Sequence, residues 1–203
     1  MGRHFLLLFL LTLPSCTFYR TTDPPITADQ QFLISEATIR AVDQLSAVAL
    51  RDRVVFVDST YLTPSTGSGQ ADTAFLIAEV RARLLVSGVR LAPERGKAQV
   101  ILELRSGGIG IDRQYYMVGL PSIALPGTSG PNGSAFATPE IAFVKNQKQR
   151  GYASVAFVAY FAESGELLAS SGPFVGRSSR EDYWLFFTGP RPTGNIPTVE
   201  KPR

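Results

Sequence analysis

The stretch GYASVAFVAYFAESGELLASS, residues 151–171, decides the fold of this chain. Its first half predicts a long strand, whose side chains point alternately to the two faces of a sheet. One face carries Ala153, Val155, Phe157, Ala159 and Phe161, and the other carries Tyr152, Ser154, Ala156, Val158 and Tyr160. Residues 163–166 predict a tight hairpin turn, after which residues 167–171 pair back on the long strand. The chain is therefore expected to contain an antiparallel sheet.

Residues upstream of this strand extend the β pattern. We expect a buried strand over residues 98–105, a turn or bulge at Gly107-Gly108, and another strand over residues 109–118. Residues 119–139 are rich in Gly, Pro, Ser and Ala, and predict a surface loop. A strand is expected to resume at 140–144, before a polar stretch.

Downstream of the hairpin, residues 174–177 predict an extension of the returning strand. An aromatic patch follows at residues 183–187, and four prolines lie beyond it. Because residues 189–203 contain few apolar side chains, they are expected to form a disordered tail.

The first part of the domain predicts a helix that begins after Thr27. Thr27 and Gln30 have the spacing of a capping box, in which the two side chains satisfy free backbone N–H groups. The residues that follow form an apolar stripe at helical spacing: Leu33, Ala37, Ala41, Leu45 and Val48.

A strand and a second helix follow. Residues 53–58 are apolar on both faces, which predicts a central strand. The second helix is expected from Asp72 to about Ser87, with Gly88 as a left-handed C-cap. The element order predicts an α+β fold, in which two helices pack on one face of a mostly antiparallel sheet.

The amino-terminal residues predict export and lipidation. Residues 5–13 form an apolar run that is shorter than the roughly 20 residues of a membrane-spanning helix. The following Leu13-Pro14-Ser15-Cys16 resembles a bacterial lipobox, although Pro14 departs from the usual pattern. The resemblance implies a signal peptide over residues 1–15, and palmitate-type acyl chains on Cys16. An ordinary secreted protein cut elsewhere and an uncleaved anchor are the alternatives.

The lipobox also divides the chain into segments. We expect residues 16–25 to hold the lipidated Cys16 and a polar spacer, and residues 26–188 to form one periplasmic domain. Thr17 follows the cysteine, and in enterobacterial lipoproteins a residue other than Asp at that position favours the outer membrane.

Composition excludes several classes of function. Cys16 and His4 are the only residues of their types, so the processed domain would have no imidazole and no free thiol. Such a domain holds no Ser-His-Asp triad, no Cys-His pair and no His-containing zinc site. Arginines are scattered along the chain at a net charge of +3, without the basic block that is typical of nucleic-acid binding. We therefore expect no catalytic residue, no metal, no cofactor and no nucleic-acid partner.

The order of elements resembles a periplasmic lipoprotein domain. This domain is shared by curli-secretion-channel lipoproteins of the CsgG type and penicillin-binding-protein activators of the LpoB type. The likeness rests on the strand at 54–58 with the helix after it, on Lys97-Ala98-Gln99-Val100, and on the hairpin around Gly165-Glu166. Gln99 stands where that family often has Asp. The resemblance implies a scaffold, channel or activator, and transfers no catalytic residue.

Carboxylates and glycine-rich segments are the other candidate sites. Asp58 ends a central strand, Glu163 and Glu166 flank a hairpin, and Glu181-Asp182 precedes Tyr183-Trp184. For Asp58, capping of the following loop is favoured over acid–base chemistry. The hairpin glutamates are expected to be solvated charges. The segment at 181–184 is expected to be an edge strand that covers the core, and a ligand contact there is less favoured. The glycine-rich segment at 66–69 has no nearby Lys, which a phosphate-binding loop requires, so a flexible loop is favoured. The glycines at 107–110 are not followed by a helix, which a dinucleotide site requires, so a bulge or turn is favoured.

These residues favour a non-catalytic, lipid-anchored envelope protein that binds another envelope component, a protein, by a sheet edge or a helix surface. A subunit of an oligomeric secretion channel is the second hypothesis, in which residues 109–144 would insert in a membrane. Pro121 interrupts that segment, and proline in mid-strand argues against a barrel wall. A carboxylate-dependent hydrolase is the third hypothesis.

The lipidation hypothesis predicts that radiolabelled palmitate enters the wild-type protein and is absent from Cys16→Ala, because the thiol is the attachment atom. Gel autoradiography of the protein isolated from labelled cells measures the difference. Equal labelling of both proteins would contradict an anchor at Cys16.

Overall fold

The computed structural model describes residues 26–62, 69–129, 135–186 and 188–196, and shows an α+β fold. The two α-helices of the described residues are α2 (Ala28–Val42) and α3 (Gly69–Val86). The main sheet is six-stranded and open, in the order β2-β1-β3-β6-β7-β8. Its strands are β1 (Val54–Asp58), β2 (Arg90–Leu91), β3 (Val100–Leu120), β6 (Ile141–Phe161), β7 (Leu167–Leu185) and β8 (Thr188–Gly194).

The main sheet is mostly antiparallel, as predicted. β3, β6, β7 and β8 pair antiparallel in succession, while β1 lies parallel to both β2 and β3. A separate two-stranded sheet joins β4 (Ala124–Ser129) to β5 (Ala135–Ala137), within the stretch that was predicted to be a loop. One turn of 3₁₀-helix lies at Val48–Leu50 and another at Arg95–Lys97.

Local sequence signals place the helix ends. The capping box of α2 is present, and the backbone N–H of Thr27 donates to Oε1 of Gln30 at 3.2 Å. Gly88 has a φ of 85°, which confirms the left-handed cap after α3. The predicted apolar stripe is wrong at Val48, because α2 ends at Val42 and Val48 is 81% exposed.

The long strands run through sequence that was predicted to be irregular. β3 is one strand with a bulge between Arg105 and Gly108, which confirms the bulge. β6 continues through the polar stretch at 145–150, because each residue there pairs with both β3 and β7. The prediction of a disordered tail is wrong for residues 189–194, which belong to β8 and pair with β7. Residues 197–203 lie outside the described residues, as do the predicted signal peptide, Cys16 and most of the spacer.

One hydrophobic core joins the helices to the sheet. It contains Ala37 and Ala41 of α2, Leu76 and Val80 of α3, and alternate residues of β3 and β6. These strand residues are Val100, Leu102, Leu104, Ala153, Val155, Phe157 and Ala159. We name the sheet face that carries them the core face, and the opposite one the outer face.

Two glycines bring α2 into backbone contact with the sheet. A Cβ on Gly176 of β7 would collide with the carbonyl oxygen of Ala37 and lie 2.5 Å from the backbone nitrogen of Ala41. A Cβ on Gly151 of β6 would lie 2.5 Å from the carbonyl oxygen of Leu33. Only glycine leaves room for this approach.

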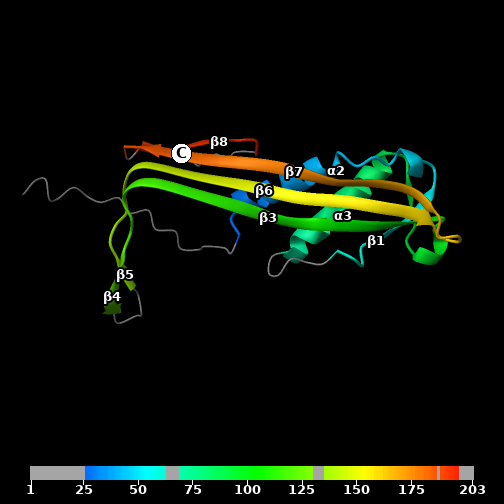
Figure 1. Ribbon diagram of the computed structural model, residues 1–203, viewed down its shortest axis with the longest axis horizontal. Coiled ribbons are helices and arrows are strands. Elements are labelled where there is room, and N and C mark those ends of the chain that lie inside the picture. Colours follow the sequence, from blue (N-terminus) through cyan, green and yellow to red (C-terminus); the bar gives the residue numbers. More distant parts are fainter. Residues whose placement is uncertain (1–25, 63–68, 130–134, 187, 197–203) are drawn as a thin grey trace, which may run out of the picture.

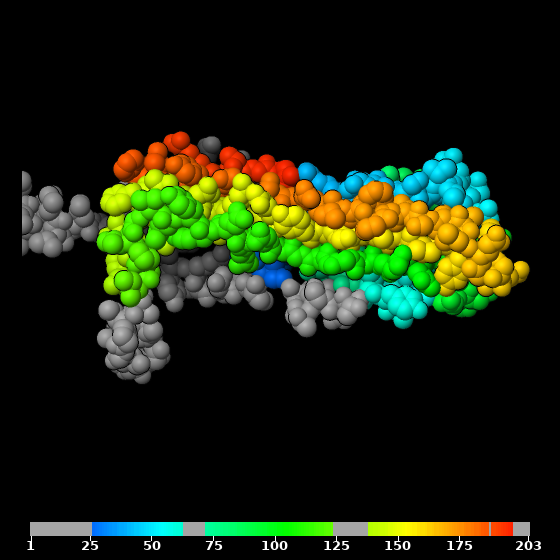
Figure 2. Space-filling view, viewed as in Figure 1, coloured from blue at the N-terminus to red at the C-terminus, as the bar shows by residue number. Residues whose placement is uncertain are grey.

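The helices cover only one end of the sheet. Figure 1 shows α2 and α3 beside that end, while β3, β6 and β7 continue past them to the end where β4 and β5 lie. Figure 2 shows the same three strands side by side along the whole length of the molecule. We name the uncovered part the distal blade: residues 112–120 of β3, 141–150 of β6, 179–185 of β7, and β8.

The close approach of α2 predicts that Gly176→Ala destabilises the fold. The added methyl group has to displace helix backbone, and overpacking of this kind costs about 1–3 kcal/mol. Urea unfolding followed by circular dichroism measures the loss. Gly110→Ala is the matched control, since a Cβ there meets nothing within 4 Å. Equal stability of the two variants would contradict the proposed contact.

Candidate functional site

The distal blade extends beyond the hydrophobic core. None of the core residues in the described part of the chain lies in it. Cross-strand polar pairs hold its strands together, and Glu181 accepts a hydrogen bond from Asn146 at 2.7 Å and pairs with Lys148 at 3.4 Å. At the root of the blade, Arg180 forms ion pairs with Asp29 of α2 at 2.5 Å and with Asp182 at 3.1 Å.

Exposed apolar side chains gather at the far end of the blade. The strand register aligns Leu120 with Ile141, and Val118 with Val144 and Leu185. We name these exposed residues, which lie on both faces of the sheet, the tip patch: Tyr115, Tyr116, Val118, Leu120, Ile123, Ile141, Phe143, Tyr183, Leu185 and Phe186. A concentration of exposed apolar residues is typical of a protein–protein or membrane contact surface.

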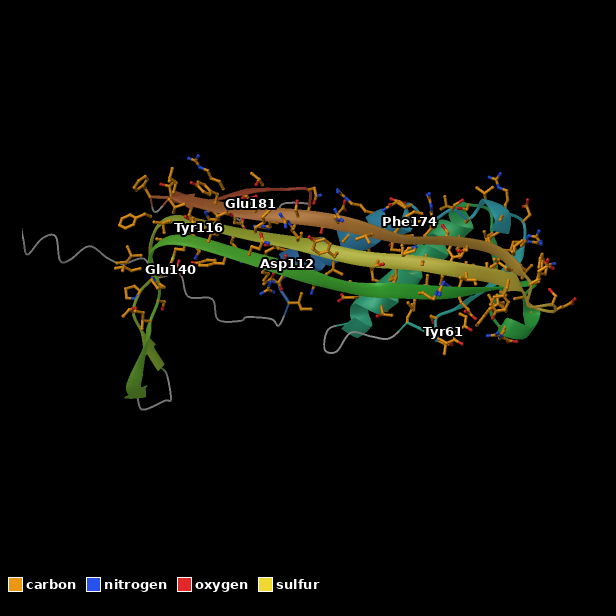
Figure 3. The ribbon with its side chains drawn as sticks, viewed as in Figure 1. Tyr61, Asp112, Tyr116, Glu140, Phe174 and Glu181 are labelled. Atoms are coloured by element: carbon orange, nitrogen blue, oxygen red, sulfur yellow. The ribbon has the colours of Figure 1, made fainter. Side chains whose placement is uncertain are left out.

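Lys145 links three strands at the base of the tip patch. Its ammonium nitrogen lies 5.3 Å from the centre of the Tyr115 ring and 5.2 Å from that of Trp184. It also pairs with Oε1 of Glu140 at 2.8 Å, and the Tyr115 hydroxyl donates to Oε2 of the same carboxylate at 2.9 Å. Cation–π and charge-assisted contacts therefore fix these side chains. Figure 3 shows Glu140 and Tyr116 at this end.

Interactions within this cluster favour the ionised form of Glu140. The hydrogen bond from Lys145 lowers the pKa of Glu140, against the opposing effect of its partial burial. The ion pair and the hydrogen bond from Tyr115 therefore orient the side chains at the tip.

One edge of β3 lacks a neighbouring strand along the blade. β1 ends at Asp58, which lies opposite Glu103, and in the described residues no other strand continues along that edge. The other edge of β3 pairs with β6 as far as Leu120. An unpaired strand edge presents backbone N–H and C=O groups that accept an additional strand.

Asp58, the candidate acid, belongs to a chain of hydrogen bonds. Its Oδ1 accepts from the hydroxyl and backbone N–H of Thr60 at 2.5 and 3.0 Å, and its Oδ2 pairs with Arg95 at 2.7 Å. Arg95 donates to the Tyr160 hydroxyl at 3.1 Å, which donates to Glu103 at 3.0 Å. The bonds from Thr60, and then Arg95, lower the pKa of Asp58 although burial opposes them. This arrangement suits a structural carboxylate.

The structure scatters the other predicted candidates. Glu163 and Glu166 are exposed at the hairpin. Of the Glu181-Asp182 pair, Glu181 pairs with β6 and Asp182 with Arg180. The glycines at 107–110 form the β3 bulge beside a hollow of about 210 Å³, whereas the glycine-rich loop at 66–69 lies almost wholly outside the described residues. Sequence reasoning missed Arg95, Tyr160, Glu140 and Lys145, because nothing in their spacing shows that they meet.

The described residues contain no group of three or more His, Cys, Asp or Glu side chains that would hold a metal ion. In the same part of the chain, no helix has the length and apolar content to cross a membrane. Cys16, the predicted lipidation site, lies outside this part.

Comparison with known families places the chain in a family of unknown function. The model of DUF6655, a family of unknown function, matches residues 16–199. A search of the curated proteins finds no match to the chain.

The hydrogen bonds of Asp58 predict an acid-dependent loss of stability. Because the folded pKa is lowered, the carboxylate stabilises the fold above its unfolded pKa of about 3.9, and this contribution is lost as the pH falls through the folded value. Asp58→Asn should lower the free energy of unfolding at pH 7 by about 1–3 kcal/mol and flatten its pH dependence below pH 4. Urea titrations between pH 2 and 7 measure both effects. Asp112→Asn, on the exposed part of β3, is the control, and an unchanged acid limb in Asp58→Asn would contradict the role.

Proposed function

Because the chain belongs to the DUF6655 family, whose function is unknown, we propose its function from the geometry of the distal blade. We infer a non-catalytic, lipid-anchored cell-envelope protein that binds another envelope protein through the blade. The single observation that carries this proposal is the tip patch beside the unpaired edge of β3.

Two kinds of contact would combine in such a complex. An extended segment of the partner would add to β3 and gain backbone hydrogen bonds, which provide affinity without sequence specificity. The tip patch would then select apolar side chains, since exposed aromatic and aliphatic groups gain most from leaving water. Val118 and Leu120 carry this part of the proposal, because they lie on β3 itself and are 46% and 63% exposed.

The anchor and the fold complete the proposal. Acyl chains on Cys16 would hold the chain at a membrane, which we propose to be the outer membrane facing the periplasm; two or more such chains give stable attachment. We also propose that both helices cover the core face alone, which leaves the outer face for partners. The shared core of α2, α3, β3 and β6 supports this arrangement.

An oligomeric channel subunit is the second candidate function. The long antiparallel strands β3 and β6, with apolar side chains near the segment that joins them, favour it. In that case the strand added to β3 would come from a second copy of the chain. A carboxylate-dependent hydrolase gains no support, because the pKa of Asp58 is lowered and its oxygens are already occupied.

The proposal predicts site-specific crosslinking in cells. A photoreactive phenylalanine analogue in place of Tyr116 should give one adduct of defined mass, and the second change Val118→Asp should remove it. Val118 is exposed, so this change should alter the free energy of unfolding by about 0.5 kcal/mol or less. Western blotting after irradiation measures the adduct.

Leu167 provides the matched control, since it is 62% exposed on β7 but lies outside the blade. An analogue there should give no adduct. An adduct from both positions, or from neither, would contradict a partner site at the tip. An adduct of twice the protomer mass, together with a large ring on sizing in detergent, would contradict the partner proposal and support the oligomeric channel subunit.

A further inference from the structure

A hollow of about 440 Å³ opens where β8 ends beside β7. The hollow is lined by Arg150 and Tyr152 of β6, by Arg177, Ser178 and Ser179 of β7, and by Asn195, which follows β8. The register places Arg150 opposite Ser179, and Tyr152 opposite Arg177. Arg150 and Arg177 are therefore diagonal neighbours on the outer face. Long side chains can reach across the distance between such positions.

The guanidinium groups of Arg150 and Arg177 make no direct polar contact with the described part of the chain. Within the residues that the structure describes, neither donates a hydrogen bond or lies within 4 Å of a carboxylate. Arg40, Arg95 and Arg180 each pair with a carboxylate, whereas Arg105, Arg113 and Arg191 also form no ion pair among the described residues. Arg150 and Arg177 differ from those arginines because both line one hollow, and Arg150 is partly withdrawn from water, where a charged group gains from a partner.

Two acids lie near the hollow. Asp112 lies opposite Arg150 in the register, yet makes no ion pair among the described residues. Glu181 accepts a hydrogen bond from Asn146 and pairs with Lys148, and the charge of Arg150 acts on it from beyond ion-pair distance. Figure 3 shows these two acids, Asp112 on β3 and Glu181 on β7. Neither carboxylate is part of the lining.

The remaining lining is also rich in donors. The backbone N–H of Ser179 donates to Oδ1 of Asn195 at 2.7 Å, and the N–H of Asn195 donates to the Ser179 carbonyl at 3.0 Å. These two bonds fix Asn195 and leave its amide NH₂ group as a donor. The hydroxyls of Tyr152 and Ser179 add further donors.

We propose that this hollow binds an oxyanion of the phosphate type. Two arginine side chains and neutral donors, with no carboxylate in the lining, match the tetrahedral set of acceptors on a phosphate group. The volume is sufficient for a phosphate ester. The phosphate would come either from a free phosphate compound or from an anionic lipid headgroup, and the chemistry of recognition is the same.

Titration with inorganic phosphate tests the site. The full chain carrying Cys16→Ala is labelled with nitrogen-15, and the amide signals of Ser179 and Asn195 are followed by NMR at constant ionic strength. We expect saturable shifts in the parent protein. Arg150→Gln and Arg177→Gln should each weaken binding at least tenfold, while Arg81→Gln, the same change at an exposed site on α3, should leave it unchanged.

Vesicle flotation then distinguishes the two sources. Retention on vesicles with phosphatidylglycerol, but not on pure phosphatidylcholine, and its loss in Arg177→Gln, would assign the site to a lipid headgroup. Phosphate binding without such retention would assign it to a free phosphate compound. The absence of saturable shifts, or equal affinity in the parent and both hollow variants with the amide spectrum otherwise intact, would overturn the proposal.

Discussion

The backbone contact between α2 and the sheet determines which end of β6 and β7 carries the hydrophobic core. At Gly151 and Gly176 no side chain separates the helix from the strands, and the Ser178 hydroxyl donates to the carbonyl of Leu33 at 2.6 Å. The helix is thereby held against one end of β6 and β7. The hydrophobic core forms at that end, so the rest of the two strands extends without a core beneath it.

The distal blade therefore depends on weaker interactions. The side chains of its ion pair between Lys148 and Glu181 are 35% and 36% exposed, and ion pairs near the surface contribute about 0–1 kcal/mol each. The ladder of backbone hydrogen bonds with neighbouring strands provides the rest of its order. Such an element opens more readily than the core and gains stability from an added strand or a bound ligand. A binding role is consistent with this distribution of stability, whereas a catalytic site requires rigid support.

The sequence was sufficient to predict the elements whose pattern or capping residues lie within the element itself. The regular alternation around Phe157 predicted β6, and Thr27 and Gly88 marked the helix ends. The polar stretch at 145–150 was missed as a strand because its side chains are polar on both faces of the sheet, and such a strand shows no apolar alternation. β8 was missed for a related reason: Pro190 and Pro192 argue against a central strand, but an edge strand tolerates them.

The candidate sites show the same limit. Asp58 stood out because it ends an apolar strand, yet its partner Arg95 lies 37 residues away, and only the folded sheet brings Tyr160 to Arg95. The tip patch and the unpaired arginines are likewise products of register, since β3, β6 and β7 align residues that no local motif connects. The outer face carries apolar side chains near Leu185 and cationic ones near Arg177, and neither group stabilises a core. Side chains that do not serve the fold in this way are the ones most available for recognition.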